Sequence, residues 1–222
     1  MIESNKWKII LNRVYALDGM RFFAAMSVVL YHYTFAGYLS SQMTLLNFKD
    51  FGDTFKYGFL GVELFFMISG FVILMTAQNK NIISFVTSRI TRLYPAFWVS
   101  VTLTALVIVL AGGERYSVDL KQYLINLTMI SDIFHVKYID GVYWTLLMEI
   151  KFYLLIGLLV AFSQINNIKR YLWFWLLLSL VNYYVELPRI VTFFFIPEYA
   201  PYFIGGQCFI RDIRINFNLE MF

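Results

Sequence analysis

Four ionisable side chains within long apolar runs of the sequence are candidates for chemistry. Arg21 and His32 fall in the first run, Glu63 in the second and Glu149 in the fourth. A charge in hydrocarbon is costly, so such residues usually face the interior of a helix bundle and mark a functional site. A histidine beside a carboxylate is the arrangement of a general base, because the acid stabilises the imidazolium that forms when a substrate hydroxyl loses its proton.

Arg21 and His32 are expected to lie on one face of a helix. They are eleven residues apart, and eleven steps of about 100° amount to about three turns plus 20°. Their axial separation is about 16 Å, half of the hydrocarbon thickness of a bilayer. Two structural alternatives stay open: Arg21 could snorkel to lipid phosphate, and His32 could be a hydrogen-bonded core residue with Tyr31 or Tyr33 as its partner.

The second and fourth apolar runs each carry a candidate carboxylate. Gly58, Gly61, Ser69 and Gly70 surround Glu63, and small residues of this kind allow close approach of helices. A residue that only packs helices would not be an acid, so Glu63 is a candidate site residue. In the fourth run Glu149 follows an aromatic pair (143–144) that is typical of a membrane interface, about 8 Å deeper.

Two arginines indicate a place for phosphate. Arg89 and Arg92 are spaced i and i+3, and guanidinium groups at this spacing can hold phosphates through forked hydrogen bonds. A purely topological role for the two charges is the alternative. Lys151 is expected to pair with an acid, and His135 to be an ordinary surface residue.

The composition of the chain indicates a membrane protein. Of 222 residues, 60% are hydrophobic and 14% are charged, whereas soluble domains are about half apolar and about a quarter charged. The net charge of +4 comes from basic residues between apolar runs, where they set topology, so nucleic-acid binding is not expected. The single cysteine, Cys208, excludes an internal disulfide, and no Cys/His cluster has metal-ligand spacing, so no metal is expected.

Six segments are predicted to span the membrane, since a spanning helix needs about 20 apolar residues. They cover residues 17–38, 59–77, 95–111, 143–162, 171–187 and 191–210. The sixth is the weakest, because Pro197, Glu198 and Pro201 interrupt it. A cleaved signal peptide is the alternative for the first, but Asp18 and Arg21 argue against it.

Basic residues alternate along the predicted loops, which fixes the expected orientation. They are Lys6, Lys8 and Arg13, then Lys80, Arg89 and Arg92, then Lys169 and Arg170, and finally Arg211 and Arg214. The positive-inside rule then places both termini in the cytoplasm. The predicted fold is an all-α, polytopic transmembrane bundle of about six spans, forming a single domain over residues 1–222. Residues 122–135 of an outer loop are expected to lie along the interface or to re-enter the membrane.

Four motifs in the sequence resemble those of the acyltransferase 3 family. They are residues 17–21 (LDGMR) leading to 31–33 (YHY), 61–70 (GVELFFMISG), 88–95 (SRITRLYP) and 143–153 (YWTLLMEIKFY). Each motif alone is loose, but the four occur in family order, each on the predicted span where the family has it. Residues 202–206 (YFIGG) vaguely continue the match.

The resemblance implies a chemistry and a set of roles. Family members move an acyl group, usually acetyl from acetyl-CoA, onto hydroxyls of cell-envelope glycans. By this resemblance Arg21 and His32 are essential and Glu149 assists, while Arg89 and Arg92 face the CoA side. Members commonly have more spans and longer chains, so a short or truncated member that lacks the C-terminal spans is implied.

The leading hypothesis is a multi-pass O-acyltransferase of the bacterial inner membrane. It would transfer acetyl from cytoplasmic acetyl-CoA to a hydroxyl of an envelope polysaccharide or a lipid-linked glycan, directly or through an acyl-histidine. The lipid bilayer and the glycan are its expected partners, and assembly with its own copies or with other membrane proteins stays open. One alternative is a secondary transporter that uses the same buried charges, although only the sixth predicted span is broken and carriers often show paired breaks. Another is a non-catalytic remnant.

Overall fold

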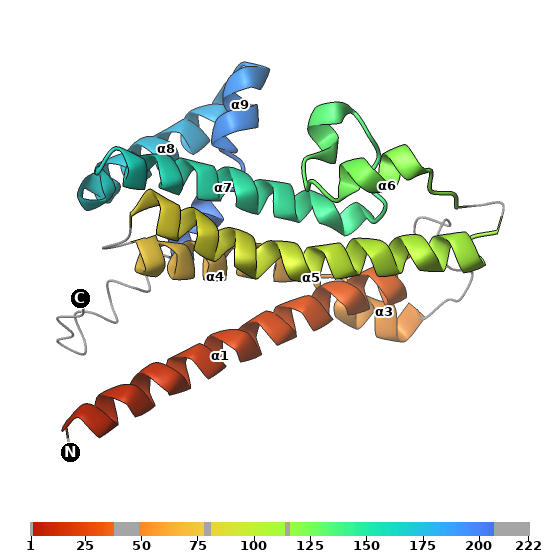
Figure 1. Cartoon of the computed structure of the whole chain (residues 1–222), viewed down its shortest axis with the longest axis horizontal. Helices are drawn as coiled ribbons and strands as arrows, with labels where there is room; N and C mark the ends of the chain where they lie inside the picture. Colours follow the sequence, from red (N-terminus) through yellow and green to blue (C-terminus); the bar gives the residue numbers. More distant parts are fainter. Residues whose placement is uncertain (1, 38–48, 78–80, 114–115, 207–222) are drawn as a thin grey trace. The chain divides into compact units, whose positions relative to one another are not determined.

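The protein is described by a computed structural model that covers residues 2–37, 49–77, 81–113 and 116–206 (Figure 1). Within these ranges the secondary structure is helical and includes no β-strand, which confirms the all-α prediction for this part of the chain. The chain divides into two compact units. Unit 1 comprises Met1–Val72 and Pro201–Met221, and unit 2 comprises Ile73–Ala200 together with Phe222. That they form a single domain stays a prediction.

Unit 1 is built on a long N-terminal helix. Its elements are α1 (Ile2–Leu30), the π-helix η1 (Tyr31–Ala36), α3 (Lys49–Phe55) and the part of α4 (Leu60–Ala77) that ends at Val72. α1 continues into η1 without a break. α3 packs beside the end of α1 and η1, as Figure 1 shows.

Glycines bring the start of α4 very close to α1. A Cβ atom placed on Gly61 would lie 2.4 Å from the Ala24 carbonyl oxygen, and Gly58 makes an equally close approach to α1. Farther along α4, a Cβ on Gly70 would lie 2.0 Å from the Phe203 carbonyl oxygen. These distances are below van der Waals contact, so only glycine permits the packing. The predicted role of the glycines in close helix approach is confirmed.

Unit 2 is organised around two long helices that lie side by side, α5 (Ile82–Ala111) and α7 (Trp144–Ala161) (Figure 1). Asn81 caps α5 by accepting a hydrogen bond from the Ser84 amide at 2.8 Å. α5 continues through Pro95, so the 88–95 motif lies inside the helix rather than before it. After the turn η4 (Ile165–Asn167), α8 (Ile168–Tyr184) and α9 (Arg189–Phe195) complete the unit.

The connection between α5 and α7 is a compact set of short helices. It contains α6 (Leu120–Asn126), η2 (Ser131–Phe134) and η3 (Gly141–Tyr143). The buried amide of Asn126 donates to two backbone carbonyl oxygens at 2.9 and 3.1 Å and accepts from the Ile139 amide at 3.0 Å. The Trp98 indole of α5 donates to the Leu127 carbonyl oxygen at 3.0 Å, which holds the connection against α5. The choice between interfacial and re-entrant placement stays a prediction.

Three helical segments are long and apolar enough to cross a membrane: Gly52–Ala77, Ile82–Ala111 and Gly141–Ala161. They include the second, third and fourth predicted spans. α5, with 30 residues, is about 45 Å long at 1.5 Å per residue, which exceeds the hydrocarbon thickness of about 30 Å. These segments support a membrane protein, whereas the count of six spans and the cytoplasmic position of both termini stay predictions.

The first, fifth and sixth predicted spans are not among these three segments. In the first, Arg21 and His32 interrupt the apolar run. In the fifth, α8 has only 17 residues. In the sixth, α9 ends before Ile196, which adopts a left-handed φ of 39°, and residues 200–206 are helical again, so the interruption predicted at Pro197 is present. The predictions on Tyr38, Lys80, Cys208, Arg211 and Arg214 lie outside the described residues.

Candidate functional site

His32, the candidate base, lies in the π-helix η1 of unit 1. A π-helix is rare and usually appears as a single turn within an α-helix, frequently at a functional site. Here the Gly37 amide donates to the His32 carbonyl oxygen, the i to i+5 bond that defines the turn. A π-helix therefore sets the position of the imidazole at the end of α1.

The surroundings of His32 are aromatic. The imidazole is half-buried, and the Tyr31 ring meets it edge-on with 5.2 Å between ring centroids. Tyr33 is 73% exposed. Within the described part of the chain no side chain donates to or accepts from the imidazole. The alternative of a core histidine bonded to a tyrosine hydroxyl is therefore not what unit 1 contains.

Arg21 forms an ion pair with Asp18, one turn earlier on α1, with 3.6 Å between Nη1 and Oδ1. The Arg21 side chain is 21% exposed. α1 is a regular α-helix up to Leu30. The rotation of about 100° per residue, from which Arg21 and His32 are expected on one face, therefore applies up to two residues before His32.

Glu63 lies in the first turn of α4, next to the glycine contacts with α1. Its Oε2 atom is buried and has no hydrogen-bond partner among the described residues. The N-terminal turn of a helix favours a negative charge, which offsets part of the cost of burying the carboxylate. Unit 1 thus holds an imidazole and a buried carboxylate oxygen that its own packing leaves unpaired.

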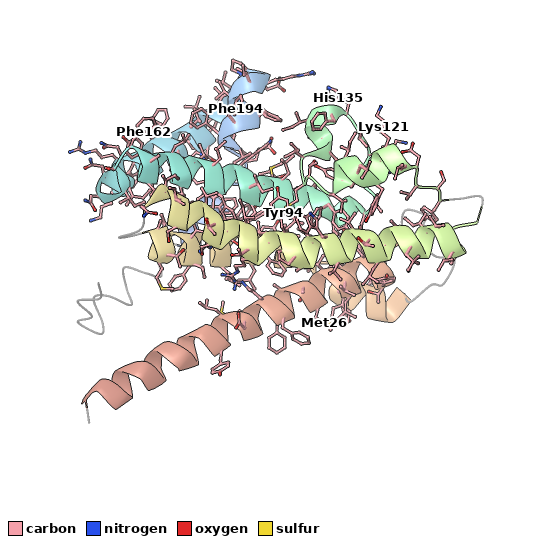
Figure 2. All side chains as sticks on the ribbon, in the orientation of Figure 1. Met26, Tyr94, Lys121, His135, Phe162 and Phe194 are labelled. Atoms are coloured by element: carbon pink, nitrogen blue, oxygen red, sulfur yellow. The ribbon has the colours of Figure 1, made fainter. Side chains whose placement is uncertain are left out.

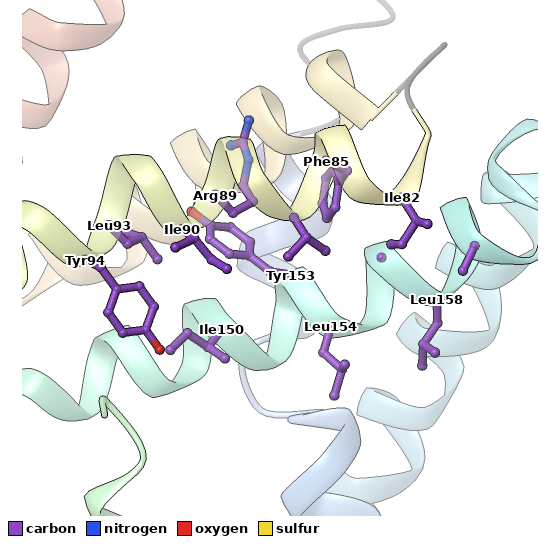
Figure 3. Close-up of a pocket in the computed structure, with 13 residues that line it drawn as sticks. Ile82, Phe85, Arg89, Ile90, Leu93, Tyr94, Ile150, Tyr153, Leu154 and Leu158 are labelled. Atoms are coloured by element: carbon purple, nitrogen blue, oxygen red, sulfur yellow. The ribbon is translucent and has the colours of Figure 1, made fainter. Parts of the chain in front are cut away.

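Arg89 is a buried cation of unit 2 that borders the groove in Figure 3. It is only 6% exposed, and its Nη2 donates to the Thr76 hydroxyl at 2.9 Å and to the Ser88 hydroxyl at 3.4 Å. Its guanidinium carbon lies 5.7 Å from the ring centroids of both Phe85 and Tyr153. Nε has no partner, and no carboxylate lies within 4.0 Å, among the residues described. The aromatic rings thus compensate a charge that no acid in the described part of the chain neutralises.

Tyr153 connects this arginine to Glu149. The Tyr153 hydroxyl donates a short hydrogen bond to Glu149 Oε1, one turn earlier on α7. Guanidinium, aromatic ring, hydroxyl and carboxylate therefore form one continuous set of contacts across α5 and α7. Tyr153 is not among the site residues predicted from the sequence, although its i+4 spacing from Glu149 is a signal for such a contact. Thr76 is thirteen residues from Arg89, and no periodicity in the sequence predicts a contact at that separation.

The second predicted arginine has a different environment. Arg92 is exposed, whereas Arg89 is buried. The predicted i, i+3 pair therefore does not converge on one pocket: Arg89 is held inside unit 2 and Arg92 faces outward. The anion-binding role of both residues stays a prediction.

Lys151 does not form the ion pair expected for it. Its Nζ lies 3.7 Å from the centroid of the Phe193 ring on α9. No carboxylate approaches within 4.0 Å of Nζ in the part of the chain described. A cation over an aromatic face is the alternative that unit 2 uses. His135, by contrast, is exposed as predicted and projects from the connection between α5 and α7 (Figure 2).

A groove of about 350 Å³ runs between α5 and α7 (Figure 3). Its lining is mostly aliphatic and includes Ile90, Ile150 and Leu154. Arg89, Tyr94 and Tyr153 supply its polar groups. Unit 2 thus offers an apolar groove beside the contacts that lead to Glu149, while unit 1 offers His32 and Glu63. The predicted pairing of His32 with a carboxylate stays a prediction.

Comparison with known proteins gives a family match over most of the chain. The model of the acyltransferase domain family matches residues 14–219. The O-acetyltransferase OatA of Staphylococcus aureus (strain NCTC 8325) is 31% identical over 164 residues, which is 66% of this chain and 24% of OatA. The putative peptidoglycan O-acetyltransferase YrhL of Bacillus subtilis (strain 168) is 30% identical over 158 residues, 63% of this chain and 22% of YrhL.

A third relative comes from another group of bacteria. Nodulation protein 10 of Rhizobium leguminosarum bv. viciae is 28% identical over 120 residues, 45% of this chain and 32% of that protein. The chain thus spans about a quarter to a third of the length of these curated relatives. No solved structure matches.

Proposed function

The chain belongs to the acyltransferase family whose model matches residues 14–219, and on this premise we propose that it is a membrane O-acyltransferase. The observation that carries the proposal is the range of residues that the family model matches, because it includes all six candidate residues. These are Arg21, His32, Glu63, Arg89, Arg92 and Glu149. The named O-acetyltransferase relatives support the same reaction class.

The proposed reaction transfers acetyl from cytoplasmic acetyl-CoA to a hydroxyl of an envelope polysaccharide or a lipid-linked glycan. The protein then acts in the bacterial inner membrane as a multi-pass enzyme. Support for an envelope acceptor comes from the relative YrhL, which is named a putative peptidoglycan O-acetyltransferase. Support for the membrane comes from the three apolar helical segments.

In a direct transfer, His32 takes the proton of the acceptor hydroxyl as its oxygen attacks the thioester carbon. The C–S bond breaks, the ester C–O bond forms, and the thiolate of CoA takes the proton that His32 held. Glu63 and Glu149 are the candidate carboxylates for stabilising the imidazolium. If the acetyl group instead passes through an acyl-histidine, the imidazole attacks the thioester first and the acceptor hydroxyl then displaces it.

Arg89 and Arg92 are proposed to hold the anionic donor. Guanidinium groups bind phosphate through forked, charge-assisted hydrogen bonds. Arg89 Nε has no partner among the described residues, and Arg92, three residues later, is exposed, so donor groups remain for such contacts. Arg21 is proposed to be essential by the family resemblance.

The test is acetyl transfer by the full chain in membrane vesicles that contain envelope glycan. Acetyl-CoA labelled in the acetyl group is supplied, and label in the glycan fraction is measured for wild type, His32→Ala and His135→Ala. The two substitutions remove the chain's two histidines in turn, so His135→Ala is the matched control. We expect loss of labelling in His32→Ala alone.

Two results would argue against the proposal. Equal labelling by wild type and His32→Ala would end the assignment of His32 as the base. Glycan flux across the vesicle membrane without consumption of acetyl-CoA would favour a transporter instead.

A further inference from the structure

The groove between α5 and α7 faces outward from unit 2. Several of its lining side chains are strongly exposed, among them Val86, Ile90, Leu154 and Leu158. Both of its walls are helical segments long and apolar enough to cross a membrane. A groove of this composition on such walls is open to hydrocarbon rather than to water.

The length of the groove matches one leaflet of a bilayer. On α5 its lining extends from Ile82 to Tyr94, and on α7 from Ile150 to Ala161. Twelve residues of an α-helix rise about 18 Å, and half of the hydrocarbon core measures about 15 Å. One extended hydrocarbon chain, lying parallel to the two helices, therefore fits the groove from end to end.

The charges along the two walls of this groove are mostly basic, with Glu149, which bonds to Tyr153, beside its Ile150 end. Between Ile82 and Ala111, and again between Ile150 and Val185, the sequence contains five basic residues and no acidic residue. The basic residues are Arg89, Arg92, Lys151, Lys169 and Arg170. Lys169 and Arg170 are exposed and lie in the first turn of α8, which follows the end of α7 that borders the groove. A lipid with an anionic headgroup is the complementary occupant.

Gly157 lines the groove on its α7 side. A Cβ atom placed there would meet the Ile82 and Phe85 side chains at 3.6 Å, an ordinary contact. Gly157 is thus unlike the glycines of α4, whose Cβ atoms would clash with backbone. An alanine would therefore fit at this position, whereas a larger side chain would extend against Ile82 and Phe85 in the groove.

From these observations we infer that the α5–α7 groove binds one acyl chain of an anionic phospholipid. The chain lies along Val86, Ile90, Leu154 and Leu158, in the leaflet nearer Ile82 and Ala161, and the headgroup reaches the basic residues that begin α8. This site does not depend on the proposed acyl transfer. It rests on the groove, on its membrane-long walls and on the surrounding charges.

The test is photolabelling of the full chain in vesicles of phosphatidylethanolamine and phosphatidylglycerol. The probe is phosphatidylglycerol with a diazirine in one acyl chain, and the labelled residues are located by mass spectrometry. We expect labelling at Ile90 and Leu154 to be severalfold above that at Val107 and Leu110, which are equally or more exposed on α5 outside the groove. Gly157→Phe fills the groove and should remove this excess, whereas Gly157→Ala should keep it.

Leu154→Trp gives a second blocking variant should Gly157→Phe fail to fold. Equal labelling of all exposed apolar positions would overturn the site, because it would indicate general lipid contact. Absence of label from the groove alone would also overturn it, because another helix or a second copy would then cover these walls. Equal excess labelling by a diazirine phosphatidylcholine would overturn the anionic assignment.

Discussion

The Tyr153 hydroxyl donates a short hydrogen bond to the Glu149 carboxylate within α7. The Tyr153 ring also lies 5.7 Å from the Arg89 guanidinium carbon on α5. One side chain therefore touches both the proposed donor-binding arginine and a candidate catalytic carboxylate. From this position we predict that Tyr153 orients Glu149 in addition to packing between the two helices.

Tyr153→Phe should lower kcat for acetyl transfer about tenfold and leave KM for acetyl-CoA within about twofold. A hydrogen bond to a charged group is worth about 1.5–3 kcal/mol, and about 1.4 kcal/mol is a factor of ten in rate. The ring is kept, so its contact with Arg89 should persist. Steady-state kinetics on reconstituted protein measure both constants.

Tyr94→Phe is the matched control, since Tyr94 lines the same groove but its hydroxyl donates to the Thr128 carbonyl oxygen. It should leave both constants within about twofold of wild type. A Tyr153→Phe enzyme with the full kcat would show that its hydroxyl has no part in positioning Glu149.

Arg92→Ala should raise KM for acetyl-CoA about tenfold without lowering the melting temperature. Arg92 is exposed, so its loss leaves no buried cavity, and one charge-assisted contact to phosphate accounts for a change of that size. Arg189→Ala, another exposed arginine outside the 88–95 motif, is the control. If it raises KM equally, the effect is one of general surface charge rather than of a donor site.

The sequence predicted the apolar helices of α4, α5 and α7 because each combines length with high mean hydropathy and few charged residues. It did not predict the π-turn at His32, since one extra residue in a turn leaves no periodic signal in the sequence. The polar residues that made the first span a functional candidate are the same ones that interrupt its apolar run. At Arg21 and His32 the residues that indicate a functional site also lower the mean hydropathy by which a membrane span is recognised.

The candidate site was predictable in residue type and less so in geometry. Arg89 and Arg92 differ in burial because one faces Phe85 and Tyr153 while the other points outward, and an i, i+3 spacing alone does not decide this. Lys151 lies over Phe193, a contact between residues far apart in sequence. Such contacts follow from how α7 meets α9, which periodicity does not specify.

Gly61→Ala should lower the free energy of unfolding by about 1–3 kcal/mol, the usual cost of overpacking. The new methyl group would overlap the Ala24 carbonyl oxygen and lie 2.9 Å from Val28 Cγ2, so α4 must move away from α1. Gly19→Ala is the matched control on α1, because nothing lies within 4 Å of its Cβ position. There, alanine in a helix should stabilise by about 0.5–1 kcal/mol. Thermal unfolding in detergent should show a lower melting temperature for Gly61→Ala and a higher one for Gly19→Ala. A lower melting temperature for Gly19→Ala would contradict the explanation by close packing at Gly61.

Tyr138 should make stability fall as the pH rises above 10. Burial, with a smaller contribution from the Asp132 carboxylate, raises the pKa of Tyr138 from 10.0 to about 12. Between these values the unfolded chain has lost the phenolic proton and the folded protein keeps it, so folding is progressively disfavoured as the pH climbs. Tyr138→Phe should remove this part of the fall in stability with pH, measured as the midpoint of denaturant unfolding from pH 8 to pH 12.

Tyr183→Phe, at an 81% exposed position, is the control and should leave the dependence of stability on pH unchanged. Because the Tyr138 hydroxyl has no partner among the described residues, Tyr138→Phe should cost little at neutral pH, and a large loss there would show that the hydroxyl is bonded after all.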